Sequence, residues 1–251
     1  MTRIVCVIPA RYGSQRLPAK PLALIHGRPM IEWAAKNAVR MGLFDAVLVA
    51  TDHEAIAEVC HKAGIEAVMT DPECPSGTDR IHQALAGREA DIVVNIQGDE
   101  PAMPSDPIAR AVESLKRTGA HVATACVPIT DRERFEDFNV VKVVRDLDDR
   151  ALYFSRSPIP SLPRRDASET SAPGYIWGYK HLGLYIYRRD ALARFCQLSP
   201  TSLEKQEKLE QLRMMEHGFH IQCITASADS VGVDVPEDLA RAEAILGRMT
   251  L

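Results

Sequence analysis

Short apolar runs and segments with helical spacing alternate through the first half of the chain. The apolar runs are rich in β-branched residues, which predicts buried strands at Ile4–Ile8, Ala46–Ala50, Ala67–Met69, Ile92–Ile96 and Val122–Val127. The segments between them predict helices at Pro29–Met41, Glu54–Ala63, Asp79–Ala86 and Asp106–Thr118. This alternation predicts an α/β fold with a mostly parallel, Rossmann-like sheet flanked by helices.

The second half departs from this pattern. We expect strands at Val140–Arg145, Ala151–Ser155, His181–Arg188 and Gln222–Ala226, helices at Leu203–His217 and Pro236–Leu246, and a long loop from Pro158 to Gly178. Thr201 and Glu204 have the spacing of a capping box. The prediction is one domain over residues 1–251, in which residues 1–130 and 189–251 form the core and 131–188 form a smaller inserted lobe.

Composition narrows the class of protein. Of 251 residues, 46% are hydrophobic and 25% charged, which suits a packed globular core. The net charge is -4, so no global basic field favours nucleic acid or an anionic membrane, and no apolar run reaches the roughly 18 residues that span a bilayer. The six cysteines are scattered and no signal-peptide pattern is present, so we expect reduced thiols and a cytoplasmic location.

A basic loop follows the first predicted strand. Arg11, Arg16 and Lys20 lie within ten residues around Gly13, at the carboxyl end of that strand. Ligands of open α/β sheets bind at this edge, and a triphosphate needs fixed positive groups around it. The loop has neither the Walker A nor the G-x-G-x-x-G pattern, which argues against P-loop NTPases and Rossmann dehydrogenases. A solvated basic loop would have the same composition.

Two acidic turns complete the candidate chemistry. Asp99 follows the strand at Ile92–Ile96, and Asp234 precedes the last predicted helix. Carboxylates at such positions can hold Mg²⁺ against phosphates. The alternative is that both residues only cap the helices or turns that follow them.

The segment Pro75–Arg80 is a further candidate loop, because it opens a helix after the third predicted strand. Its hydroxyls and Arg80 could contact the polar edge of a pyrimidine. Alternatively, Ser76 or Thr78 serves only as the helix N-cap.

Taken together, these segments resemble the 3-deoxy-manno-octulosonate (Kdo) cytidylyltransferases, the CMP-Kdo synthetases of Gram-negative lipopolysaccharide synthesis. The resemblance covers nearly the whole chain. It is carried by I-P-A-R-Y-G-S-x-R-L-P-x-K-P-L at 8–22, S-G-T-D-R at 76–80, N-I-Q-G-D-E-P at 95–101, N-x-V-K-V-V at 139–144, A-L-Y-F-S-R-x-x-I-P at 151–160, H-L-G-L-Y at 181–185, L-E-Q-L-R at 209–213 and V-D-x-P-E-D-L at 233–239.

The resemblance implies a magnesium-dependent transfer of CMP from CTP to the anomeric hydroxyl of Kdo, with release of pyrophosphate. It implies a nucleotide site formed by Ala10, Arg11, Gly13, Ser14, Arg16, Lys20, Ser76 and Arg80. Asp99 and Asp234 are the implied magnesium ligands, and with Arg16 and Lys20 they form the implied catalytic set. The implied sugar site consists of Gln97, Arg156, His181, Tyr185, Glu210 and Gln211.

The sugar-site residues also have ordinary alternatives. Glu210 and Gln211 could lie on the solvated face of their helix, while His181 and Tyr185 could serve strand packing alone. The chain departs from the family pattern where Ala19 replaces a usual glycine, where Cys74 and Pro75 replace a polar pair, where Phe138 replaces a common proline, and throughout the 161–178 loop. These departures affect sugar specificity more than reaction type.

Three other functions stay open. The acceptor could be an 8-amino analogue of Kdo or a nonulosonate, the protein could be a glycosyltransferase, or it could be a non-catalytic CTP sensor. The pair Asp99 and Asp234 argues against the sensor, which has no need of a metal pair. The resemblance further implies a homodimer, to which Trp33 or Trp177 could contribute.

Overall fold

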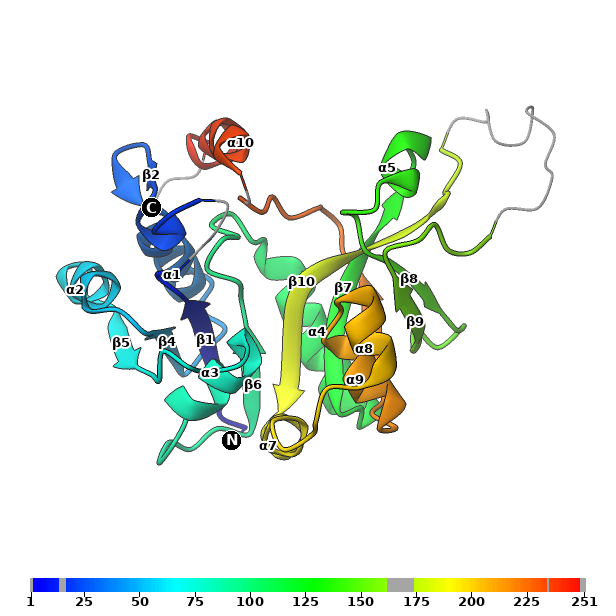
Figure 1. Ribbon diagram of the computed structural model, residues 1–251, viewed down its shortest axis with the longest axis horizontal. Helices are drawn as coiled ribbons and strands as arrows, with labels where there is room; N and C mark the ends of the chain where they lie inside the picture. Colours follow the sequence, from blue (N-terminus) through cyan, green and yellow to red (C-terminus); the bar gives the residue numbers. More distant parts are fainter. Residues whose placement is uncertain (1, 14–16, 162–173, 234, 249–251) are drawn as a thin grey trace. The chain divides into compact units, whose positions relative to one another are not determined.

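The computed structural model describes residues 2–13, 17–161, 174–233 and 235–248, which fall into two compact units (Figure 1). Unit 1 contains residues 2–109, 184–196 and 230–248, and unit 2 contains 110–183 and 197–229, within those described ranges. The chain therefore passes between the units four times. The predicted lobe of residues 131–188 differs from unit 2, which begins at Arg110 and takes up residues 197–229 as well.

Unit 1 is built on a mostly parallel sheet. Strand β1 (Ile4–Ala10) lies between β4 (Ala46–Thr51) and β6 (Ile92–Asn95), and β5 (Glu66–Met69) extends the sheet beyond β4, all in parallel register. The second part of β10 (Gly178–Arg188) pairs with β6 and is antiparallel to it. The side chains of β1 and β6 are almost all buried because helices cover the sheet, as the apolar runs predicted.

Helices of unit 1 follow the strands in the predicted order. They are α1 (Met30–Arg40), α2 (Glu54–Lys62), α3 (Gly77–Ala84), α7 (Arg189–Phe195) and α10 (Pro236–Leu246). A short 3-10 helix η1 (Lys20–Leu22) and a hairpin of β2 (Leu24–Ile25) and β3 (Arg28–Pro29) lie between β1 and α1, and α10 contacts that hairpin. Helix α4 (Ser105–Thr118) begins in unit 1 and ends in unit 2.

Unit 2 combines parallel and antiparallel pairing. Strands β7 (Val122–Ile129) and β11 (Ile221–Thr225) are parallel, and the first part of β10 follows β7 in the strand order. Strands β8 (Lys142–Arg145) and β9 (Ala151–Ser155) form an antiparallel hairpin. The parallel β7–β11 pair explains why residues beyond the predicted lobe belong to this unit.

One predicted helix is wrong. The segment Leu203–His217 forms two helices, α8 (Ser202–Glu207) and α9 (Gln211–Glu216), because Lys208 between them has a left-handed backbone with φ 56°. Hydrogen bonds from Ser155 and Arg156 to Glu207 anchor the end of α8 and fix this break. The Glu204 half of the predicted capping box is present, since its carboxylate accepts the Thr201 N–H at 3.2 Å.

Other differences are smaller. Helix α3 begins two residues before its predicted start, and Pro29 lies at the N-cap of α1 rather than in its first turn. The short helices α5 (Arg132–Glu136) and α7 and the β2–β3 hairpin were not predicted, because segments this short carry little periodicity. All six cysteines fall within the described ranges and are free thiols. None of the helices in those ranges is both long and apolar enough to cross a membrane.

Candidate functional site

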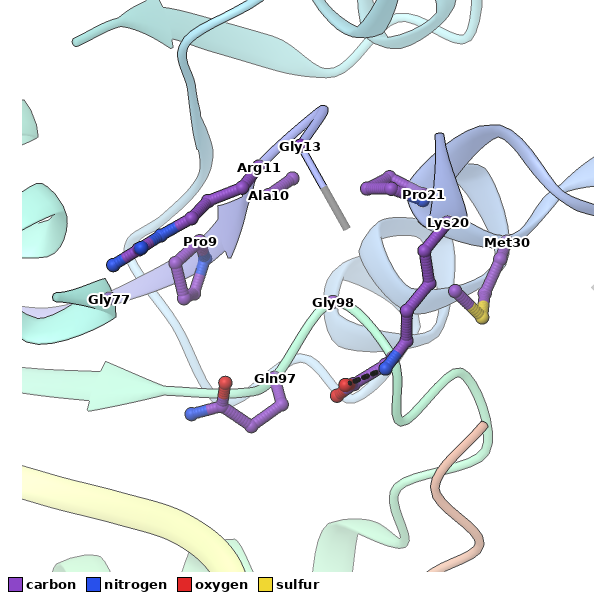
Figure 2. A pocket seen from close by; sticks show the side chains of 11 residues that line it. Pro9, Ala10, Arg11, Gly13, Lys20, Pro21, Met30, Gly77, Gln97 and Gly98 are labelled. Carbon is purple, nitrogen blue, oxygen red and sulfur yellow. Dashed lines mark hydrogen bonds and ion pairs between the residues drawn. The ribbon is translucent and has the colours of Figure 1, made fainter. Parts of the chain in front are cut away.

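The carboxyl ends of β1 and β6 border a pocket of about 330 Å³ in unit 1. Its walls come from the turn after β1, the start of η1, the first turn of α3 and the turn after β6. Figure 2 shows its lining residues, which are Pro9, Ala10, Arg11, Gly13, Lys20, Pro21, Met30, Gly77, Gln97, Gly98 and Asp99. The pocket therefore lies at the edge of the sheet that the sequence indicated, and it brings together the predicted residues Ala10, Arg11, Gly13, Lys20, Gln97 and Asp99.

An ion pair lies at one side of this pocket. Lys20 Nζ lies 2.5 Å from Asp99 Oδ2, and the two side chains are 13% and 34% exposed. The dashed line in Figure 2 marks this contact. The pocket thus places a cation from the basic loop directly against the carboxylate that follows β6.

The backbone conformation of Ala19 explains why the family pattern has glycine at this position. Ala19 has φ 49° and ψ 36°, a left-handed conformation that costs a non-glycine residue about 1–2 kcal/mol. Ala19 is the N-cap of η1, and Lys20 is the first residue of that helix. A glycine would adopt this conformation without that cost, which accounts for the glycine expected there from the resemblance.

Gly98 allows the turn after β6 to approach β1. A Cβ atom at this position would lie 3.0 Å from the Pro9 carbonyl oxygen and 3.4 Å from Ile31 Cδ1. The contact with the carbonyl oxygen is unusually tight for a carbon atom, so a side chain here would push the turn away from β1. Glycine at position 98 therefore lets the Gln97–Asp99 turn lie directly beside the end of β1.

Two predicted polar residues line the pocket away from the ion pair. In Figure 2 the Arg11 side chain runs past Pro9 toward Gly77, and Gln97 lies on the other side of Pro9. Gln97 Nε2 donates to Asn95 Oδ1 at 3.2 Å. Asn95 is in register with Tyr185 across the β6–β10 pair, so the two sugar-site residues predicted in unit 1 are positioned by neighbouring strands.

Ser76 caps helix α3, which was the alternative to a contact with a pyrimidine base. It is the N-cap of α3, where its hydroxyl accepts the Asp79 N–H at 3.2 Å and donates to the Asp79 carboxylate at 2.7 Å. The adjacent Cys74 thiol donates to Gln83 Oε1 at 3.1 Å. This loop brings Gly77 into the pocket wall and keeps its own polar groups largely engaged.

Arg80 is fully buried, which differs from the expectation of a side chain facing a base. Its Nη1 donates to Thr70 Oγ1 at 2.5 Å and its Nη2 donates to Asp52 Oδ2 at 3.0 Å. A guanidinium with no exposed surface makes no direct contact with a ligand in this conformation. Arg80 instead ties α3 to the ends of β4 and β5.

Three predicted residues of the nucleotide and metal sites, Ser14, Arg16 and Asp234, lie outside the described residues. Their chain neighbours are placed. The Val233 N–H donates to the Asp99 carbonyl oxygen at 2.9 Å, and Leu17 packs against the core cluster that contains Val233 and Met30. Over the described ranges, no group of three or more His, Cys, Asp or Glu side chains is arranged to hold a metal ion.

Unit 2 carries the other predicted sugar-site residues, and one of them is Arg156. Its Nε–H donates to the Glu207 carbonyl oxygen at 2.8 Å, and its backbone N–H donates to the Glu207 carboxylate at 3.0 Å. Its guanidinium carbon lies 5.9 Å from the centre of the Phe138 ring. Glu207 therefore fixes the guanidinium along one edge.

His181 is buried in unit 2. Its Nε2 lies 2.9 Å from Thr124 Oγ1, and its ring meets the Phe154 ring edge-on at 4.9 Å between centroids. Burial, aided by the nearby Lys180 charge, lowers the pKa of His181 to about 3. The imidazole is therefore neutral at physiological pH.

The structure places Glu210 and Gln211 at the start of α9. Glu210 is half-buried, and Gln211 is only 4% exposed, so the interpretation of Gln211 as part of a solvated face is wrong. The helix breaks at Lys208, and Gln211 and Leu212 after the break are both buried. The predicted continuous helix had placed Gln211 on its solvated face.

Sequence reasoning missed several residues of the unit 1 site. Met30, Pro9 and Gly77 line the pocket, and Asp52 bonds both Arg80 and the Tyr12 N–H. Asp52 could have been found, because it directly follows an apolar strand at the ligand-binding edge of the sheet. Met30 could not, since a buried methionine at the start of a helix has no signal that separates it from core.

Comparison with known proteins identifies the family of this chain. Residues 5–222 match the cytidylyltransferase family. The chain is 45% identical over 246 residues to a 3-deoxy-manno-octulosonate cytidylyltransferase of Bdellovibrio bacteriovorus, covering 97% of this chain and 98% of that protein. It is 46% identical over 246 residues to the enzyme of the same name from Thioalkalivibrio sulfidiphilus, covering 95% and 97%.

Solved structures give the same result. The structure of a CMP:2-keto-3-deoxy-manno-octonic acid synthetase complexed with CTP has a TM-score of 0.89 and 38% identity, and the match covers 98% of this chain and 99% of that one. A 4-diphosphocytidyl-2C-methyl-D-erythritol synthase from Anaerococcus prevotii, at 14% identity and a TM-score of 0.64, shares the fold. The chain therefore belongs to the cytidylyltransferase family and, by its full-length relatives, to the 3-deoxy-manno-octulosonate cytidylyltransferases within it.

Proposed function

We propose that this protein transfers CMP from CTP to the anomeric hydroxyl of Kdo, which gives CMP-Kdo and pyrophosphate. The observation that carries the proposal is the pocket at the carboxyl ends of β1 and β6, which is lined by Arg11, Lys20 and Asp99. Full-length relatives bear the name of this activity, and a structural relative at 38% identity is a complex with CTP. CMP-Kdo made in this way would serve lipopolysaccharide synthesis.

In this proposal the pocket holds the triphosphate. Arg11 and Lys20 supply positive charge, and the glycine at position 13 lets the backbone approach a phosphate closely. Lys20, which is paired with Asp99 in the present structure, would turn to the phosphates and offset the charge of the departing pyrophosphate. Ser14 and Arg16 are assigned to the same phosphates from the resemblance alone.

We further propose that Asp99 and Asp234 hold Mg²⁺. Asp99 fits a hard cation, because its carboxylate lines the pocket, is a third exposed and already faces a positive group. The hydrogen bond from Val233 to the Asp99 carbonyl oxygen brings the segment before Asp234 next to Asp99. When bound, the ion would withdraw charge from the α-phosphate and lower the pKa of the sugar hydroxyl.

For the sugar, we propose that Arg156 pairs with the carboxylate of Kdo and that Gln97, His181, Tyr185, Glu210 and Gln211 bind its hydroxyls. A guanidinium held along its Nε edge by Glu207 keeps its terminal nitrogens in a fixed direction. His181 would act as a neutral hydrogen-bonding group, since its pKa of about 3 leaves it uncharged. The homodimer and the cytoplasmic location stay predictions from the resemblance and the composition.

The experiment that tests the proposal measures pyrophosphate release by the purified protein with CTP, Mg²⁺ and Kdo. Release is expected only when all three are present, with little release when UTP replaces CTP. An 8-amino analogue of Kdo and a nonulosonate are the competing acceptors, and faster turnover of either would reassign the sugar. CTP binding without release for any acceptor would contradict the transferase and favour a sensor.

A further inference from the structure

Two of the walls of the unit 1 pocket come from distant parts of the sequence. One wall is the backbone turn after β1, with Arg11 and Gly13, and the other is the first turn of α3, with Gly77. A nucleotide held between a phosphate-binding turn and a helix start depends on the distance between them. Whatever fixes the first wall to the second therefore sets the geometry of the pocket.

The carboxylate of Asp52 contacts both of these elements. Its Oδ1 accepts the backbone N–H of Tyr12 at 3.0 Å, and its Oδ2 accepts Nη2 of Arg80 at 3.0 Å. Tyr12 lies between the two pocket residues Arg11 and Gly13, while Arg80 lies one helical turn after Gly77. One side chain thus links the phosphate turn to α3.

The Arg80 end of this link is largely buried, whereas the Tyr12 end is exposed. The Arg80 side chain has no exposed surface and that of Asp52 is 13% exposed, so the pair is shielded from water and salt. Arg80 Nη1 also donates to Thr70 Oγ1 at 2.5 Å, and the Thr70 hydroxyl donates in turn to the Thr51 carbonyl oxygen at 2.9 Å. The guanidinium is therefore held at the ends of β4 and β5 by contacts within the protein.

A ring contact reinforces the same connection. The Tyr12 ring stacks on the ring of His53, the residue after Asp52, with 3.8 Å between centroids and 12° between planes. His53 Nδ1 accepts the Ala55 N–H at 3.2 Å and caps α2, which fixes that ring. The Tyr12 backbone and side chain are thus both held by the two residues that follow β4.

We propose that Asp52 is a positioning residue of the CTP site, which sets the phosphate turn at residues 11–13 relative to the first turn of α3 through Tyr12 and Arg80. This inference rests on the proposed function, since it assumes that CTP binds in this pocket. In this scheme Arg80 acts through Asp52 rather than by touching the base. Loss of the link widens or tilts the pocket and weakens CTP binding, while the sugar site keeps its affinity.

The test compares Asp52→Asn with the wild type. The amide keeps the size of the side chain but has only one oxygen. Either its NH₂ group faces the Arg80 guanidinium, or that group replaces the oxygen that accepts the Tyr12 N–H. In both orientations the buried guanidinium loses its counter-charge. Hydrogen bonds to charged groups of this kind correspond to about tenfold or more in an equilibrium constant. We expect the Kd for CTP by calorimetry and the KM for CTP to rise about tenfold, with the KM for Kdo changed less than about twofold.

Glu66→Gln is the matched control. Glu66 on β5 pairs with Arg88 at 2.6 Å in the same unit, and both side chains are far more exposed than Asp52 and Arg80. This control should leave the Kd for CTP unchanged. If Asp52→Asn lowers only the melting temperature and leaves the Kd and KM for CTP at wild-type values, the pair is structural and the proposal is overturned.

A second variant covers the case in which Asp52→Asn does not fold. Arg80→Lys keeps the positive charge, but one ammonium cannot reach both Thr70 and Asp52 as the guanidinium does. It should raise the Kd for CTP in the same direction, and the double variant should be no worse than the more affected single variant, because both act on one link. Additive losses in the double variant would show that Arg80 acts on CTP without Asp52.

The outcomes separate this inference from the proposed function. If the wild type binds no CTP and releases no pyrophosphate, the proposed function is wrong, and the positioning role of Asp52 is wrong as well. If the wild type binds CTP and the Asp52 and Arg80 variants bind it equally well, only the positioning role fails.

Discussion

In unit 1, Lys20 and Asp99 meet at the edge of an open pocket, whereas in unit 2 His181 and Gln211 are buried. The first pair joins the first residue of η1 to the turn after β6. The second set lies on a strand and a helix, and the His181 contact is with a neighbouring side chain. The pair that we assign to the departing phosphates thus borders a pocket, whereas the groups that we assign to sugar hydroxyls are held in the interior of their unit.

The same difference appears between two arginines that we assign to ligands. Arg11 lines the unit 1 pocket, while Arg156 in unit 2 is fixed by the Glu207 carbonyl oxygen and stands over the Phe138 ring. A fixed guanidinium suits recognition of a planar carboxylate in one orientation. A less constrained one suits phosphates that change charge and position during the reaction.

The largest effect is expected from Asp99→Asn, which removes the negative charge of the ion pair in unit 1. The amide keeps the shape but loses the charge that pairs with Lys20 and that we assign to Mg²⁺. We expect kcat/KM for CTP to fall by about a thousandfold, or about 4 kcal/mol, measured by pyrophosphate release. Thermal stability should change little, because partly exposed ion pairs contribute about 0–1 kcal/mol.

Glu32→Gln is the control for that variant, since it removes a carboxylate paired with Lys36 at 2.7 Å on α1. This variant should keep wild-type kcat/KM. Near-normal turnover of Asp99→Asn would remove Asp99 from the catalytic set.

The next effect concerns unit 2 and the variant Arg156→Lys. A lysine keeps the charge but cannot donate to the Glu207 carbonyl oxygen and bind a carboxylate through two parallel N–H groups at once. We expect the KM for Kdo to rise about a hundredfold, while the Kd for CTP stays within about twofold. Equal losses for both substrates would mean that Arg156 supports the fold of the enzyme rather than sugar recognition.

How far the sequence predicts each unit depends on the type of element. Strands β1, β4, β5 and β6 of unit 1 and helix α10 were predicted to within two residues, because apolar runs and a Pro-started helix have strong local signals. The break at Lys208 was not predicted, since it depends on hydrogen bonds from Ser155 and Arg156 to Glu207, about fifty residues away along the chain. Local patterns carry no information about such contacts.

The residues of the candidate site also differ in how far the sequence alone predicts them. Lys20 and Asp99 could be paired from their positions after two strands, because parallel neighbouring strands end at one edge. The burial of Arg80 could not be predicted, since an arginine in the first turn of a helix is exposed by default. Only the placement of Thr70 and Asp52 around it reveals that this charge is compensated inside the protein.

The pH dependence of stability offers a third way to sharpen the comparison. Burial lowers the pKa of His181 to about 3, while a histidine in the unfolded chain has a pKa of about 6.5. Between these values the unfolded state binds the additional proton, so the stabilisation is complete above about pH 6.5 and decreases as the pH falls toward 3. At pH 5 the loss is about 2 kcal/mol.

His181→Gln should therefore reduce the decrease in unfolding free energy between pH 7 and pH 5, measured by chemical denaturation at both values. Thr124→Val, which removes the partner at 2.9 Å but keeps the histidine buried, should be less stable at both pH values with the wild-type difference between them. An unchanged difference in His181→Gln would contradict the burial of a neutral imidazole.

The smallest effect is expected from relieving backbone strain at one matched position in each unit. Ala19 in unit 1 and Lys208 in unit 2 have φ 49° and 56°, so Ala19→Gly and Lys208→Gly should each remove about 1 kcal/mol of strain, partly offset by the freedom of glycine in the unfolded chain. Denaturation curves should show both variants as stable as the wild type or more so. Ala19→Gly also loosens the backbone that aims Lys20 at the pocket, and we expect it to change the KM for CTP about twofold. Lys208→Gly lies in the other unit and should leave that KM unchanged, and an equal change in both variants would mean that the backbone at Ala19 does not control Lys20.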